Sequence, residues 1–228
     1  MFANGATGRS AAQAYLRRLG QRRKPLPVLA AIRFHAAIFS SDPATLGEAA
    51  CALARVDKWA EIIQWFGEWR KRVDLPAWAL ANLSAALDAL GNESEAEEVA
   101  RRALSAPRDH STDGHRARVA FGAASRGERE ETGKLLTEID EENLSTNELF
   151  LVRVTQALLM ASDADRGGVE TPYWRAFTLL SRAAALAPGY RNNRLLNRAW
   201  NRAAWQIARS HSRTVLGAVL KWMAIQYG

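Results

Sequence analysis

The stretch that decides the fold is residues 77–106, AWALANLSAALDALGNESEAEEVARRALSA. Its apolar residues recur at helical spacing on both sides of a short polar turn. Gly91 stands where the end of a helix favours a left-handed residue, and Ser94 stands where the next helix needs a capping side chain. The stretch therefore predicts two helices joined by a turn.

The second of these helices belongs to a series of similar segments. They centre on Ala60, Ala96, Thr132 and Ala176, at spacings of 36, 36 and 44 residues, and the loop ASDADRGGVE lengthens the last spacing. Recurrence at about 20–50 residues is typical of stacked supersecondary units. We therefore predict an all-α fold, a right-handed α-α superhelix of stacked helix hairpins.

Three segments are expected along the chain. Residues 1–41 are predicted to form a basic N-terminal arm with a short helix ending at Gly20, a proline-containing linker and a second helix. Asp42 before Pro43 is a helix-start signal, and four helix pairs are expected over residues 42–188. A basic amphipathic capping helix and an apolar C-terminal helix are expected over residues 189–228.

Composition excludes several classes of protein. Hydrophobic residues make up 48% and charged residues 24% of the 228, which is typical of a folded domain. Cys51 is the single cysteine, so an internal disulfide or a cysteine-based metal cluster is excluded. No apolar run reaches the roughly 18–20 residues of a membrane span. We expect a cytoplasmic protein, although the arginine-rich residues 1–41, which lack Asp and Glu up to residue 41, also fit an organellar transit peptide.

Charge is distributed unevenly. The net charge of +7 combines +6 over residues 1–75, −6 over residues 76–145 and +7 over residues 146–228. Two basic ends flank an acidic middle, a pattern that bears on partners rather than on fold.

The helix pairs resemble tetratricopeptide repeats (TPR) over about residues 42–188. That motif alternates small and bulky residues in two helices and closes with a proline. The second pair carries the motif most fully, at Leu83, Ser84, Leu87, Gly91, Ala96, Ala100, Ala103 and Pro107. The other pairs carry parts of it, at Leu46, Gly47, Ala50 and Ala60, at Val119, Ala120, Ala123, Gly127, Leu136 and Ile139, and at Tyr173, Ala176, Leu180, Ala183 and Pro188.

The resemblance implies a protein-interaction adaptor or scaffold within a larger assembly. The first helix of each pair would line its groove, at Ala81, Asn82, Ala85, Asp88, Ala117, Arg118, Phe121 and Arg153. Members that grip a chaperone C-terminus use an asparagine where this chain has Glu48 and Ala85, so that activity is not expected.

The C-terminal segment carries a basic stripe at helical spacing. Its members are Arg191, Arg194, Arg198, Arg202, Trp205, Arg209 and Arg213, with Leu196, Trp200, Ala203 and Ile207 on the opposite face. This helix either closes the end of the array with a polar face or binds an anionic partner, which is an acidic protein or nucleic acid. A membrane surface is a third, less favoured partner. The alternative function is thus a nucleic-acid-associated protein that contacts phosphates through both basic ends.

The last residues, VLGAVLKWMAIQYG, are apolar nearly all round and must be buried. They either pack on the last repeat or form a homo- or hetero-oligomer interface. The cluster DHSTDGH, with Asp109, His110, Asp113 and His115, holds metal-compatible side chains at no known ligand spacing, and we expect turn and capping roles. No catalytic motif is present, so we expect no enzyme, no cofactor and no metal.

Overall fold

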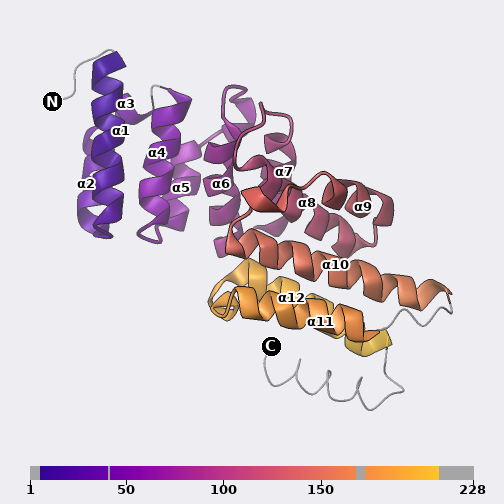
Figure 1. Cartoon of the computed structure of the whole chain (residues 1–228). Coiled ribbons are helices and arrows are strands. Elements are labelled where there is room, and N and C mark those ends of the chain that lie inside the picture. Colours follow the sequence, from indigo (N-terminus) through magenta and orange to yellow (C-terminus); the bar gives the residue numbers. More distant parts are fainter. Residues whose placement is uncertain (1–5, 41, 168–172, 211–228) are drawn as a thin grey trace. The chain divides into compact units, whose positions relative to one another are not determined.

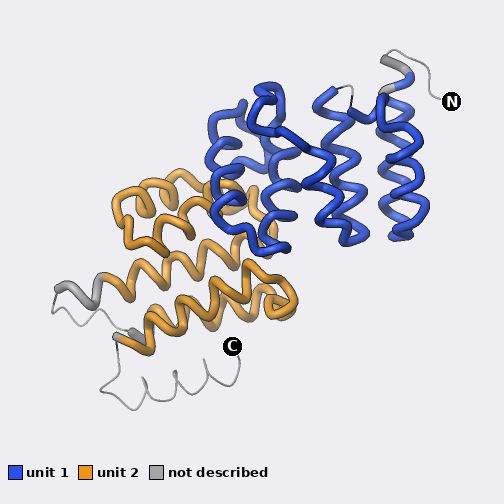
Figure 2. Tube along the Cα trace, turned by 180° about the vertical axis from the view of Figure 1, so that it is seen from behind, with its two compact units in different colours: residues 1–112 blue, residues 113–228 orange. Residues whose placement is uncertain are grey.

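The computed structural model describes residues 6–40, 42–167 and 173–210. Within these ranges every regular element is a helix and no strand occurs, so the all-α prediction is confirmed. The chain forms two compact units, residues 1–112 and residues 113–228 (Figure 2).

The first unit is built from helices that pack on others close to them in the chain, although not always on the next one (Figure 1). Its elements are α1 (Ala6–Gln21), α2 (Pro25–Phe34), α3 (Ala36–Phe39), α4 (Pro43–Ala54), α5 (Trp59–Phe66), η1 (Trp69–Lys71), α6 (Ala77–Leu90) and α7 (Glu93–Ala103). Helix α4 packs on α1, α5 and α6, and α6 also packs on α5 and α7. One apolar core runs through all of these helices.

Two local signals act as the sequence predicts. The Asp42 carboxylate accepts hydrogen bonds from the N–H groups of Ala44 and Thr45, at 3.1 and 3.0 Å, and caps α4. Gly91 ends α6 with φ of +88°, and the N–H of Asn92 donates to the carbonyl of Leu87 at 2.8 Å. This left-handed residue allows N–H groups after the helix to donate hydrogen bonds to carbonyls in its last turn that have no partner within the helix.

The described part of residues 1–41 is helical and packed. Leu16 and Val28 are fully buried in the core of the first unit. Helix α1 continues through Gly20 to Gln21, and α2 begins at Pro25, inside the expected linker. Two prolines fit there because the first turn of a helix needs no N–H donors.

Two details of these helices differ from the register expected from the sequence. Ala60 is exposed in the first turn of α5, and Ile62, two residues later, is buried in its place. Helix α7 begins at Glu93, before Ser94, and its N-cap Asn92 makes no side-chain capping bond. The acidic residues of this first turn instead complement the positive end of the helix dipole.

Small residues permit close packing between α4 and α6. A Cβ on Gly47 would lie 2.4 Å from Cη2 of Trp78 and 3.0 Å from Cβ of Ala79. The indole of Trp78 therefore occupies the space that a side chain at Gly47 would need.

The second unit has the same all-helical construction. Its elements are α8 (Thr112–Arg126), α9 (Arg129–Thr137), η2 (Glu141–Asn143), α10 (Thr146–Gly167), α11 (Tyr173–Leu186), η3 (Tyr190–Asn192) and α12 (Arg194–Ser210). Helix α10 packs along both α11 and α12, and these three supply most of the second core.

Helix α10 is longer than the sequence predicts. Its start is fixed by Ser145 and Glu148, since the Ser145 N–H donates to Glu148 Oε2 at 2.7 Å and the Glu148 N–H donates to Ser145 Oγ at 3.4 Å. The helix runs on through the expected loop to Gly167 because no helix-breaking residue precedes that glycine.

Candidate partner-binding groove

Two antiparallel stripes of side chains face outward from α10 and α11. On α10 the stripe includes Leu149 and Arg153, and on α11 it includes Leu179, Arg182 and Leu186, at spacings of three or four residues. Such spacing places residues on one side of a helix. Because α10 and α11 pack along each other, the two stripes meet.

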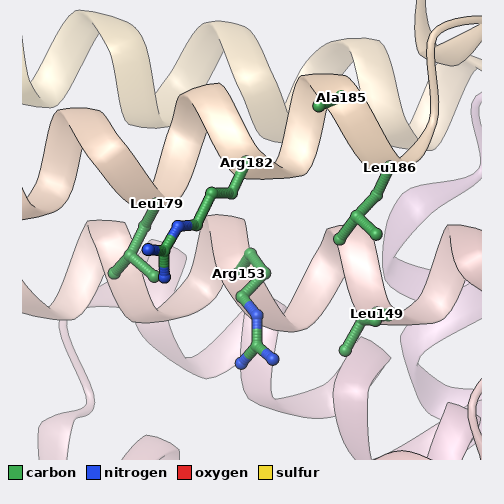
Figure 3. Close-up of a pocket in the computed structure, with 6 residues that line it drawn as sticks. All are labelled: Leu149, Arg153, Leu179, Arg182, Ala185 and Leu186. Carbon is green, nitrogen blue, oxygen red and sulfur yellow. The ribbon is translucent and has the colours of Figure 1, made fainter.

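The stripes enclose an open groove of about 610 Å³. Figure 3 shows Leu186 beside Leu149 at one end, Leu179 toward the other, and Arg182 and Arg153 between them. Leu149, Leu179 and Leu186 are each only half-buried. The groove thus offers apolar surface at both ends and two guanidinium groups in its middle.

The two arginines differ in their partners. Arg153 Nη1 donates to Glu141 Oε1 at 2.7 Å, and Arg153 Nη2 donates to Glu141 Oε2 at 2.5 Å. Arg153 Nη1 also donates to Gln156 Oε1 at 3.1 Å. Arg182 is exposed, and no carboxylate among the described residues pairs with it. The groove lining therefore carries two positive charges, and Glu141 of η2, which is not part of the lining, neutralises the one on Arg153.

The residues predicted to line a TPR-like groove lie in several environments. On α6, Ala85 is exposed and Asp88 is buried, while Ala81 and Asn82 are half-buried. The Asn82 side-chain amide donates to Cys51 Sγ at 3.3 Å and to the carbonyl of Trp78 at 3.2 Å.

The predicted residues of the second unit divide between two helices. On α8, Ala117, Arg118 and Phe121 are all buried. Arg153 lines the α10–α11 groove. The sequence analysis did not single out Leu149, Leu179, Arg182 and Leu186. The sequence shows only their helical spacing, and their accessibility depends on how α10 and α11 pack.

Most of the basic stripe that falls on α12 is exposed, whereas Arg198 is half-buried. Arg194 and Arg209 are exposed, and Trp205 is 50% exposed. The opposite face, with Leu196 and Ile207, is buried in the second core.

Two stripe residues contact α8 within the same unit. The Arg198 guanidinium carbon lies 5.8 Å from the centre of the Phe121 ring, and Arg202 donates a hydrogen bond to the carbonyl of Ser125. Arg191, in η3, is exposed and lies 5.8 Å from the Tyr190 ring centre. Arg213 and the apolar segment after it lie outside the described residues.

The DHSTDGH segment makes capping and pairing contacts. Asp109 Oδ2 accepts a hydrogen bond from the N–H of Trp78 at 3.0 Å and so caps α6, whose N-cap position is a proline. Burial raises the pKa of Asp109, but hydrogen bonds from Ser111 and Trp78 outweigh burial and hold the pKa below its ordinary value. Asp113 pairs with Arg116 at 2.7 Å.

Within the described ranges no group of three His, Cys, Asp or Glu side chains is placed to hold a metal ion. A second cavity, of about 320 Å³, lies in the first unit and includes Leu29, Arg33, Glu61 and Trp65. Its lining carries one charge of each sign, whereas the larger α10–α11 groove has a net positive charge.

Comparison of the chain with protein-family models, with curated proteins and with solved structures finds no match. None of the helices in the described ranges has both the length and the apolar character needed to cross a membrane.

Proposed function

We propose that this protein is a cytoplasmic adaptor or scaffold subunit that binds a segment of a partner protein. In this proposal the hairpins stack as a right-handed TPR-like superhelix, and the chain positions its partner without catalysing a reaction. The α10–α11 groove is the binding surface. The observation that carries the proposal is the half-buried leucines that stay accessible on both walls of this groove.

The accessible leucines can contribute binding free energy. Burying apolar surface yields about 25 cal/mol per Å² removed from water, so partly exposed leucines have binding energy still to contribute. Arginine is also one of the side chains most enriched at the centres of protein interfaces. The groove, apolar with arginine in its middle, is therefore lower in free energy when a protein segment covers it than when water does.

The test is a pull-down of the tagged full chain from native lysate, with nuclease, read by mass spectrometry. We expect a stoichiometric partner to be captured by the wild type and lost with Leu186→Arg. The matched control is Val73→Arg, which also replaces an aliphatic residue by arginine, at a 94% exposed position of the first unit. Circular dichroism verifies that both variants fold. Equal capture by both variants would refute the groove as the binding surface.

The alternative function is binding of nucleic acid through the basic ends. The observation that favours it is α12, which carries exposed Arg194 and Arg209 around a half-exposed Trp205 and contains no acidic residue. Arginines that track phosphates and an aromatic ring that stacks on a base are the usual elements of single-strand binding.

Labelled single-stranded RNA and DNA of mixed sequence test this alternative by fluorescence anisotropy. Binding that falls steeply with salt and is lost in the double variant Arg194→Glu, Arg209→Glu would support it. These two positions are preferable to Arg198 and Arg202, because the latter contact α8 and their loss would also disturb packing. No binding at low salt would remove the alternative.

A further inference from the structure

We propose that the α10–α11 groove selects partner segments that carry an aspartate or glutamate side chain between two apolar residues, and that Arg182 binds this carboxylate. This inference rests on the proposed function, since it names the chemistry of the segment that occupies the groove.

One positive charge in the groove is not balanced by a carboxylate of the described residues. Both carboxylate oxygens of Glu141 accept hydrogen bonds from Arg153, so Glu141 is committed to that partner. Arg182 lines the same groove and has no carboxylate partner in the part of the chain that the structure describes. The net positive charge of the groove is therefore located at Arg182.

Binding of a partner removes water from the Arg182 guanidinium. A partner that lies on the leucines shields Arg182 from water, and a guanidinium that loses water without gaining an anion is costly. A carboxylate removes that cost, because the planar guanidinium matches it with two parallel hydrogen bonds. A lysine or arginine at the same place would add repulsion. The groove thus discriminates among partners by charge as well as by apolar contact.

The spacing of the α11 residues determines where the partner's carboxylate lies. Leu179 and Leu186 are seven residues apart on α11, which is about 10 Å along a helix axis. Arg182 lies between them, about one turn from each. Leu149 stands beside Leu186 and widens the apolar surface at that end (Figure 3). The partner's acidic side chain therefore falls between two apolar side chains that are about 10 Å apart.

The experiment is a selection of random 16-residue peptides, displayed on phage, against the full chain. Selected peptides are synthesised with an amidated C-terminus, so that only side-chain carboxylates remain, and their affinities are measured by fluorescence anisotropy. Each peptide is also made with its acidic residue changed to glutamine and to lysine. The protein variants are Arg182→Glu and Leu186→Arg, with Arg194→Glu as the control for loss of an exposed arginine elsewhere in the second unit.

We expect the selected peptides to share an acidic residue flanked by apolar ones. Loss of one charge-assisted pair is worth roughly tenfold or more in affinity, so the glutamine peptide binds at least about tenfold more weakly. Arg182→Glu should no longer bind the acidic peptide and should bind the lysine peptide more tightly than the wild type does. Arg194→Glu should bind every peptide with the affinity of the wild type.

Two other results are distinguishable. Peptides that require Leu186 but carry no acidic residue, or that ignore Arg182→Glu, would overturn the carboxylate inference and leave the adaptor function standing. If no selected peptide depends on Leu186, the groove is not a peptide-binding surface, and the proposed function and this inference fail together.

Discussion

Replacing Gly47 by alanine tests the close packing between α4 and α6. The new Cβ would lie 2.4 and 2.5 Å from two carbons of the Trp78 indole and 3.0 Å from the Ala79 Cβ. Real carbon–carbon contacts are optimal at about 3.5–4.0 Å, so the indole and the α6 backbone must shift. Gly47 lies inside α4, however, where alanine is otherwise the better helix former.

The two effects oppose each other, and their magnitudes decide the sign. Alanine in place of glycine in a helix interior gains up to about 1 kcal/mol. Inserting a carbon into a filled interface costs about 1–3 kcal/mol. We expect Gly47→Ala to lower the free energy of unfolding by roughly 1 kcal/mol, which is the middle of the range for the packing cost minus the full gain in helix propensity.

The assay is urea unfolding of the full chain, followed by far-UV circular dichroism, with hydrogen exchange to assign the loss to the first unit. The decisive comparison repeats the substitution in a Trp78→Leu background, where the distal carbons of the indole are absent. There Gly47→Ala should become neutral or stabilising, by up to about 1 kcal/mol. If Gly47→Ala stabilises the wild-type chain, or has the same effect in both backgrounds, the close contact does not determine this packing.

Three further predictions concern Asp109, Ser145 and Cys51. Asp109→Asn should cost about 1 kcal/mol of stability in urea unfolding, because an amide has only one acceptor oxygen for the N–H groups of Trp78 and Ser111 and lacks the negative charge at the start of α6. Because the folded pKa of Asp109 is lowered, its contribution to the free energy of unfolding is complete above the unfolded pKa and is lost as pH falls through the folded pKa. An acid-unfolding transition that is the same in Asp109→Asn as in the wild type would contradict this. Ser145→Ala should cost about 1 kcal/mol at the start of α10, seen as faster amide exchange in its first turn, and no change there would argue against the capping box. Burial raises the pKa of the Cys51 thiol, so a thiol reagent at pH 8 should label Cys51 at least about tenfold more slowly than free cysteine. The labelling rate should rise to that of free cysteine when urea unfolds the first unit. Immediate labelling of the folded chain would contradict the burial.

The helix ends could be predicted where their signals are local. Asp42 before Pro43 and Gly91 after an apolar run each fix a helix end through bonds to residues within a few positions. The same local reasoning failed at residue 25, where two prolines indicated a linker and the first turn of α2 accommodates them.

The candidate groove could not be predicted because it depends on contacts between helices. Leu149 and Leu186 meet only when α10 and α11 pair in the observed register. Family resemblance placed Arg118 and Phe121 on a groove, yet both are buried in the structure. A register taken from a repeat motif says which face of a helix a residue occupies, but not what covers that face.

The cap on α6 also constrains the order in which the chain acquires structure during synthesis. Trp78 lies in the first turn of α6, and its capping carboxylate at Asp109 is made 31 residues later. A nascent chain that has emerged only to Pro107, where the sequence analysis places the end of the second helix pair, contains every residue of α6 and α7 but lacks this partner. Fragments intended for expression of the first unit alone should accordingly extend to Thr112, where that unit ends, rather than stop at the proline.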